Sequence, residues 1–317
     1  MIIQRPNVDG YRYGRIPSLA LTSKKTLIAC YEWRRELSDW SKIDLKFIRS
    51  TDGGETWENV KIIYGDTHTL NNPVFIIKGE TVHFLFCEDY KRMFHCKSTD
   101  DGKTFTEPSE ITYAIENAFP YTVVAPGPGH GTVHNGNLIA PIWVVNNPSD
   151  LLAHRPSFIS TIYSDDDGES WSVGEVIGKY LFTNPSEAAI AVDNDNRVCL
   201  SIRNENREKA RRGFAVSDNG YSNWSKVQFA EALPDPICQG SMYSFNGKLY
   251  HINCNHTTER KNLTVKISGD CFETYNEIVI DDNSGYSDIA VDENYIYVFY
   301  ERDIMNEGLL IFKKIEK

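Results

Sequence analysis

The sequence repeats one short phrase, Ser-x-Asp-x-Gly-x-Thr/Ser-aromatic, along most of its length. Three copies are well preserved, a fourth is looser, and in a fifth Phe272 replaces the glycine. Their first residues are 48, 66, 53 and 51 positions apart, and the copies occupy Ser50–Trp57, Ser98–Phe105, Ser164–Trp171, Ser217–Trp224 and Ser268–Tyr275. A period of about 50 residues predicts supersecondary units that are stacked or arranged around an axis.

The phrase has the chemistry of a turn. Its serine and aspartate can bond to nearby backbone amides, its glycine supplies a positive φ, and its aromatic residue can pack under the turn. Between the copies, nine runs rich in β-branched and aromatic residues are typical of strands. They are Leu45–Ser50, Val82–Phe86, Leu138–Val145, Phe158–Ser164, Val198–Arg203, Lys248–Asn253, Leu263–Ser268, Tyr295–Glu301 and Leu309–Ile315.

These features predict an all-β fold, a six-bladed β-propeller, as one domain over residues 1–317. Five turns and one blade without a readable copy account for the six blades. We expect the C-terminal strands to pair with the N-terminal segment, because this closure leaves no sheet edge exposed. No helix of three turns is expected, and Glu205–Arg212 should form a short helix or a charged loop.

The net charge of −11 argues against nucleic acid or an anionic membrane surface as a partner. An acidic protein that binds an anionic ligand therefore needs a local cluster of arginines. No apolar run is long enough to span a membrane, and Met1–Gly10 lacks the pattern of a signal peptide. The seven cysteines include no CxxC pair and mostly lie in apolar runs, as expected of small core residues in a reducing compartment. These features predict a cytoplasmic location, although export by another route remains open.

Several segments between the turns combine arginines, carboxylates and a tyrosine. They are Tyr13–Leu19, Pro126–Gly131, Ser186–Ala191 followed by Leu200–Asn204, Leu233–Ser241, Arg260–Val265 and Gly285–Ile289. Together they resemble the exo-α-sialidase (neuraminidase) family over nearly the whole chain. The repeated turn of that family is known as the Asp-box. The resemblance implies hydrolysis of terminal sialic acid, sialylated glycans or sialosides as partners, and no cofactor or metal.

The resemblance assigns three arginines to the carboxylate of sialic acid. Arg15 matches the first, Arg203 the second and Arg260 the third, with Lys261 and Lys266 as alternatives to Arg260. Planar guanidinium groups bind a carboxylate through paired charge-assisted hydrogen bonds, each worth roughly 1.5–3 kcal/mol. Three of them would meet the need for a local cluster of arginines in an acidic protein.

The resemblance also assigns the reacting groups. Tyr286 matches the nucleophile and Glu187 the base that activates it. Asp39 matches the acid/base aspartate, with Asp44 and Glu36 as rivals. A tyrosine suits this reaction because the anomeric carbon of sialic acid carries a carboxylate, which would repel an Asp or Glu nucleophile, and sialidases are a known exception to the two-carboxylate rule. Two displacements at that carbon would retain its configuration.

Two further residues are expected to support the site. Glu301 matches the acidic residue that orients the first arginine. Either Arg34 or Arg35 is expected to line the pocket near the N-acyl group, and Arg34 is our choice. His130 lies in a glycine-rich turn, where a bond to the backbone is favoured over a catalytic role. The eight histidines show no zinc spacing, and the Asp-box carboxylates are expected to cap turns rather than bind calcium.

Other functions stay open at this point. A non-catalytic Asp-box propeller could bind glycans or proteins, although the tyrosine and glutamate are both present. A trans-sialidase would need an acceptor platform, for which Trp33, Trp40 and Tyr121 are candidates. A related nonulosonic acid could replace N-acetylneuraminic acid, because three arginines would read only the carboxylate. Ser186 stands where relatives commonly have Asn, which bears on details of the pocket.

Overall fold

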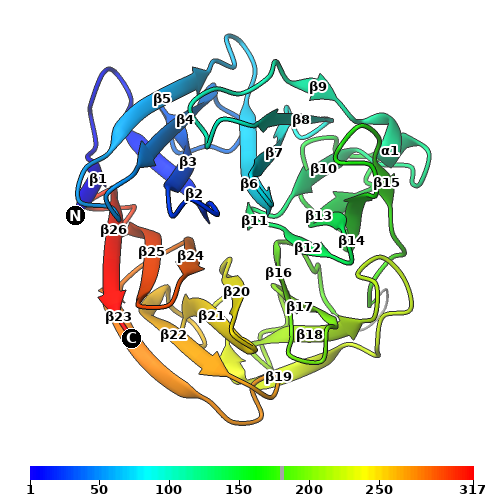
Figure 1. Cartoon of the computed structure of the whole chain (residues 1–317). Helices are drawn as coiled ribbons and strands as arrows, with labels where there is room; N and C mark the ends of the chain where they lie inside the picture. The colour runs from blue at the N-terminus through cyan, green and yellow to red at the C-terminus, as the bar shows by residue number, and fades with distance from the viewer. Residues whose placement is uncertain (179–181) are drawn as a thin grey trace.

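The computed structural model describes residues 1–178 and 182–317. Its strands form six sheets of four or five strands around a central axis, as Figure 1 shows. The expected six-bladed β-propeller is confirmed. Within the described residues the one α-helix is the four-residue α1 (Tyr113–Glu116), and no helix there is long and apolar enough to cross a membrane.

Each blade is built on an antiparallel meander that runs outward from the axis. The first two blades contain β2 (Tyr13–Leu21), β3 (Leu27–Arg34), β4 (Ile43–Ser50) and β5 (Glu58–Ile63), then β6 (Leu70–Lys78), β7 (Thr81–Glu88), β8 (Arg92–Ser98) and β9 (Ser109–Glu110), with β11 (Gly129–His130) parallel to β6. The third contains β10 (Val123–Pro126), β12 (Thr132–His134), β13 (Asn137–Val145), β14 (Ser157–Ser164) and β15 (Ser172–Val173).

The remaining blades follow the same plan. The fourth contains β16 (Ala188–Val192), β17 (Val198–Ile202), β18 (Arg211–Ser217) and β19 (Gln228–Pro234), and the fifth β20 (Ser241–Phe245), β21 (Lys248–Cys254), β22 (Lys261–Ser268) and β23 (Asn276–Asn283). The sixth contains β24 (Ser287–Val291), β25 (Tyr295–Arg302), β26 (Leu309–Glu316) and the N-terminal β1 (Ile2–Gln4). Eight of the nine predicted runs lie wholly in strands, and the ninth, Val198–Arg203, extends one residue past the end of β17. The charged segment from Glu205 is a loop that leads into β18.

The ring closes by pairing its two ends. β1 is antiparallel to β26, with Ile2 opposite Ile311 and Gln4 opposite Leu310, and the two termini lie near each other in Figure 1. The expected closure is therefore confirmed. Since β26 has a partner on its outer side, its edge is protected from pairing with another chain.

Each Asp-box joins the third strand of a blade to the fourth. In the first copy, Ser50 Oγ accepts a hydrogen bond from Gly54 N–H at 2.8 Å, and the Asp52 carboxylate accepts bonds from the amide and hydroxyl of Thr56 at 3.0 and 2.6 Å. These are the bonds that the turn chemistry predicts. The aromatic residue that ends this copy packs between blades, since the ring centroid of Trp57 lies 5.1 Å from that of Phe312 in the sixth blade.

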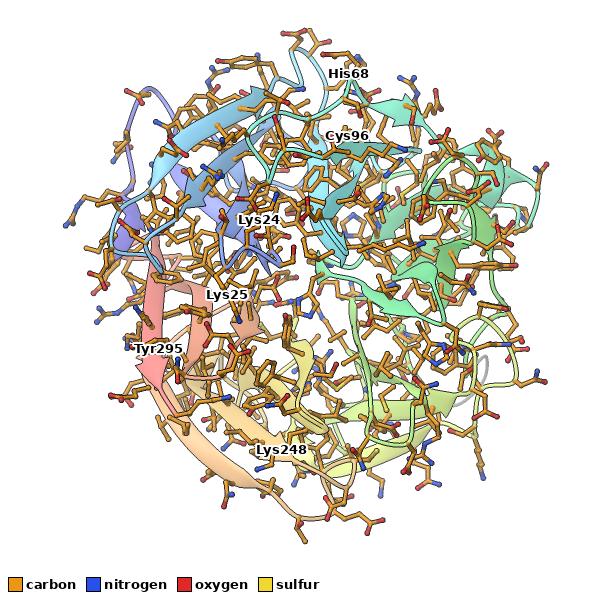
Figure 2. All side chains as sticks on the ribbon, viewed as in Figure 1. Lys24, Lys25, His68, Cys96, Lys248 and Tyr295 are labelled. Carbon is orange, nitrogen blue, oxygen red and sulfur yellow. The ribbon has the colours of Figure 1, made fainter. Side chains whose placement is uncertain are left out.

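Side chains from neighbouring blades fill the space between the sheets. Phe47 of the first blade contacts Phe75 and Phe84 of the second, with ring centroids 6.1 and 4.6 Å apart. The seven cysteines are all free thiols and six are buried, as expected of core residues. Cys96, labelled in Figure 2, is one of these buried thiols.

The inner strands give the disc two distinct faces. The turn between β2 and β3 lies on one face, where Lys24 and Lys25 are labelled near the centre of Figure 2. Lys25 there pairs with Glu293 of the sixth blade at 2.6 Å. Arg15 lies near the opposite end of β2, and strands rise about 3.3 Å per residue. The amino ends of the inner strands therefore meet at the other face.

Two glycines with a positive φ provide a test of the packing: Gly102 of the second Asp-box, and Gly79 of the turn between β6 and β7. Gly102 has a φ of +76°, and a Cβ there would lie 2.2 Å from Ile28 Cδ1, whereas Gly79 has a φ of +59° with open space around it. Gly79→Ala should cost roughly 1–2 kcal/mol for the left-handed backbone alone. Gly102→Ala should cost a further 1–3 kcal/mol or so, because the buried Ile28 must move. Thermal unfolding of both variants measures the difference, and equal losses would contradict the close packing of this turn.

Candidate active site

A cavity of about 240 Å³ opens where the amino ends of the inner strands meet. Six of the residues predicted from the sequence line it together, although the first and last lie 271 positions apart (286 − 15) in the chain. They are Arg15, Asp39, Glu187, Arg203, Arg260 and Tyr286. The sequence motifs thus converge on one site.

The strand ends explain this convergence. Arg15 lies near the start of β2, Glu187 directly precedes β16, and Tyr286 directly precedes β24. Arg203 follows the end of β17, which is antiparallel to β16, so its backbone N–H donates to the Glu187 carbonyl at 3.1 Å. Arg260 directly precedes β22 and reaches the site from the rim.

Tyr286, Glu187 and Arg203 form a hydrogen-bonded group on the floor of the cavity. The Tyr286 hydroxyl donates to Glu187 Oε1 at 2.6 Å, and Arg203 Nη1 donates to the tyrosine oxygen at 2.7 Å while it pairs with Glu187 Oε2. Tyr286 is 7% exposed, and burial raises its pKa above the usual value. The phenol is therefore neutral at physiological pH, and its proton already points at a carboxylate.

Glu301 lies beneath this group and is fully buried. Its carboxylate accepts bonds from Arg15 Nε at 3.1 Å, Ile16 N–H at 2.9 Å and Tyr286 N–H at 3.2 Å. A Cβ at Gly285 would lie 2.5 Å from Glu301 Oε2, which explains the glycine before the tyrosine. The structure thus contains the predicted contact between Glu301 and Arg15, and Glu301 also fixes the backbone of Tyr286.

The three arginines surround Tyr286. The guanidinium carbons of Arg15 and Arg260 lie 5.5 and 5.4 Å from the centroid of its ring. Arg203 Nε is buried without a partner in the described part of the chain, and Arg260 donates only to the Ile237 carbonyl, at 3.3 Å. The other guanidinium N–H groups of Arg260, which is exposed, are available to an anion.

The two alternatives to Arg260 lie outside the cavity. Lys261 pairs with Glu259 at 2.5 Å, on the surface. The Lys266 side chain is buried elsewhere, where it donates to the Ala232 carbonyl and to Asn255. Their positions leave Arg260 as the third cation of the cluster.

Asp39 faces the cavity from the loop between β3 and β4, with its side chain 40% exposed. Arg34 Nη1 donates to its Oδ1 at 2.7 Å. Burial opposes ionisation of Asp39, but the guanidinium of Arg34 outweighs burial and holds the pKa of this carboxyl below its usual value. Its rivals lie elsewhere, since Asp44 is buried in β4 against Tyr11 and Glu36 is exposed outside the cavity.

Arg34 does not line the cavity, contrary to its predicted contact with substrate. It is fully buried, and its guanidinium is occupied by Glu32, the Leu37 carbonyl and Asp39. Its position makes it a support for Asp39. Arg35 is exposed and lies over the ring of Tyr11, 4.7 Å from its centroid, so it does not enter the cavity either.

The sequence analysis did not predict several other residues that line the active-site cavity. These lining residues are Asn72, Tyr90, Trp143, His154, Arg155, Asn184 and Glu205. His154 lies among aromatic rings, and the centroid of its ring is 5.0 Å from that of Tyr90 and 5.2 Å from that of Trp143. These residues stand in segments without a motif. Asn72 is the exception, since Asn-Asn-Pro at 71–73 matches the pattern of Arg-Ile-Pro at 15–17.

His130 lies outside the cavity. Its Nε2 bonds to the Met242 carbonyl at 2.9 Å, as expected, and its Nδ1 lies 2.7 Å from Asp288 Oδ1. It lines a separate cavity with Leu19 and Met242 along the inner strands. The expected bond to the backbone is thus present, and the histidine supports the centre of the propeller rather than the rim.

Comparison with known proteins supports the motifs. The chain is 28% identical to a sialidase of Bacteroides fragilis, over 92% of this chain and 60% of that protein. Among solved structures, it matches the Hadza microbial sialidase Hz136 with a TM-score of 0.82 and 21% identity, over 97% of this chain and 66% of that one. It matches an intramolecular trans-sialidase of Ruminococcus gnavus with a TM-score of 0.75 and 15% identity, over 96% and 95%.

The chain spans less than two thirds of the length of the Bacteroides protein. At these low identities, the similarity to the solved structures is a similarity of fold. The model of the BNR repeat-like domain matches residues 61–298, well over half of the 317 residues. The chain therefore belongs to the BNR repeat-like domain family, and its resemblance to the exo-α-sialidases is confirmed.

Proposed function

We propose that this protein is a retaining exo-α-sialidase that removes terminal sialic acid, or a related nonulosonic acid, from glycans. The observation that carries the proposal is the buried hydrogen bond between Tyr286 and Glu187. It faces Asp39 across a cavity whose lining includes Arg15, Arg203 and Arg260. The sialidase names of its relatives agree with it. A propeller that only binds glycans would have no use for a phenol held against a buried carboxylate.

The arginines would bind the substrate carboxylate. Arg15 is oriented by Glu301 and Arg203 by Glu187, so both guanidinium groups are ordered before substrate arrives. Their order lowers the entropy that binding costs. Arg260 would complete the cluster from the rim. The bound carboxylate would then place the anomeric carbon beside the Tyr286 oxygen.

In the first step, Tyr286 would attack the anomeric carbon while its proton passes to Glu187. The bond to the leaving group would break as Asp39 donates a proton to the glycosidic oxygen. Asp39 must carry a proton to do so, and the charges of Arg34 and, to a smaller extent, Arg15 lower its pKa. A bound carboxylate would offset the charge of Arg15 and thereby raise that pKa.

In the second step, Asp39 would take a proton from water, which attacks the same carbon. The bond to Tyr286 would break, and Glu187 would return the proton to the phenol oxygen. Each displacement inverts the anomeric carbon, so the two together retain its configuration. Arg203 Nη1, 2.7 Å from the phenol oxygen, would stabilise the negative charge that develops on that oxygen in both steps.

We infer that the protein hydrolyses its substrate rather than transferring the sialic acid to another sugar. The three aromatic candidates for an acceptor platform do not line the cavity: Trp33 is buried against Tyr11, Tyr121 bonds to the Lys91 carbonyl, and Trp40 packs on Tyr90. Analysis of products in the presence of lactose separates the reactions. A hydrolase would release free sialic acid, an enzyme that transfers to lactose would form sialyllactose, and an intramolecular trans-sialidase would form an anhydro-sialic acid.

Tyr286→Phe tests the nucleophile. It should lower kcat on a fluorogenic α-sialoside by more than about 10³-fold, because no covalent intermediate can form through the ring. A fluorinated sialosyl fluoride should add its glycosyl mass to the wild-type peptide that carries Tyr286, and not to the variant. An adduct on another residue would disprove the role of Tyr286. If wild type released neither sialic acid nor a deaminated or pseudaminic-type sugar, the enzyme proposal itself would be wrong.

Asp39→Ala tests the general acid. Sialyllactose has a basic leaving group that needs a proton, so kcat/KM should fall by about 10²–10⁴-fold. An aryl sialoside has an acidic phenol as its leaving group, which departs without a proton from Asp39. The first displacement on this substrate should therefore be much less affected. Glu36→Ala is a matched control on the same loop and should change neither rate. Equal losses on both substrates would show that Asp39 does not protonate the leaving group.

A further inference from the structure

A second cavity of about 350 Å³, here called the annex, adjoins the active site. The two cavities share four wall residues, Arg155, Arg203, Glu205 and Arg260. The annex therefore continues the active site rather than forming a separate hollow, and a ligand large enough would occupy both.

The annex is strongly cationic. Of the five charged side chains that line it, four are arginines and one is a glutamate, in a chain whose net charge is −11. Arg155 pairs with Glu205, with a closest contact of 2.5 Å, and Arg203 pairs with Glu187. Arg207 is exposed and has no carboxylate within 4.0 Å among the described residues. Its charge is thus available to a ligand.

One wall of the annex is apolar and rigid. It consists of Pro236 and Ile237, in the loop before β20. The buried Asp235 carboxylate accepts from Cys238 N–H at 2.8 Å and so closes the loop. Ile237 has a φ of +63°, a strained conformation for a β-branched residue, and its carbonyl accepts from Arg260. The loop therefore sets the position of both the apolar wall and an arginine.

The shared residues locate the annex relative to a substrate. Arg203 and Arg260 would hold the carboxylate on the anomeric carbon, and they also line the annex. The leaving group is bonded to that same carbon. A leaving group that extends past Arg203 and Arg260 would therefore enter the annex.

We propose that the annex binds the sugar of the leaving group and selects sugars that carry an anionic substituent, a carboxylate or a sulfate. The ring of that sugar would lie against Pro236 and Ile237, and its anionic group would meet Arg207 and Arg155. This inference rests on the proposed sialidase function. It names a substrate class, glycans in which the sugar next to the terminal sialic acid is itself acidic.

Three substrates and two variants test the annex. The substrates are an α2,8-linked sialic acid dimer, a sialyllactose sulfated on galactose, and plain sialyllactose, so that carboxylate, sulfate and neutral leaving groups are compared. Arg207→Gln should lower the ratio of kcat/KM for an acidic leaving group over the neutral one by about three- to tenfold, the loss expected for one partly exposed ion pair. Lys209→Gln, a matched control on the same loop that does not line the annex, should leave the ratio unchanged.

The outcomes separate this inference from the function on which it rests. A fall with one acidic substrate alone identifies whether carboxylate or sulfate is preferred. An unchanged ratio with both, or equal falls for Arg207→Gln and Lys209→Gln, overturns the annex while hydrolysis of sialyllactose still supports the sialidase. If wild type hydrolyses none of the three, the sialidase proposal fails. Calorimetric binding of the dimer then decides the annex, which is overturned if Arg207→Gln binds it as tightly as wild type.

Discussion

The site depends on one buried carboxylate, Glu301, at the seam where the ring closes. It belongs to β25 of the sixth blade, and it accepts hydrogen bonds from Arg15 and Ile16 of the first blade and from the backbone of Tyr286. An unpaired carboxylate in this place would be very costly, since it is fully buried. The same contacts that neutralise it fix the proposed nucleophile and the first arginine relative to each other. The contacts that join the sixth blade to the first therefore also position the site.

The next blade repeats this device. Glu32 of β3 is fully buried, and it accepts a hydrogen bond from the backbone of Asn72 at 2.8 Å and pairs with Arg34. Asn72 has a φ of 58° and Ile16 a φ of 52°, and each is followed by a proline. Both residues stand where the register of an inner strand is irregular. In each case a glutamate from the preceding blade holds a left-handed residue at the wall of the cavity. One copy supports Arg15 and Tyr286, and the other supports Asp39 through Arg34.

Repeated turns and ordered motifs made the fold and much of the site predictable. The Asp-box bonds are local, so Ser50, Asp52 and Gly54 could be interpreted without a structure. Arg34 shows the limit, because its neighbours in sequence suggested a place in the cavity, while Glu32, two residues away, holds it beneath Asp39. His154 and Arg155 could not be foreseen, since their packing against residues of other blades leaves no local pattern.

The charges divide the site into a fixed floor and an adaptable rim. Arg15 and Arg203 are largely buried, and each is held by a carboxylate of its own, so the cost of ordering them is met during folding. Arg260 and Arg207 are exposed and lack a carboxylate partner among the described residues, so their charges can pair with groups of a ligand. A fixed floor suits the one carboxylate common to all sialic acids. A rim whose cations have no carboxylate partner of their own suits leaving groups that differ from glycan to glycan, and this is where we expect substrate preference to be set.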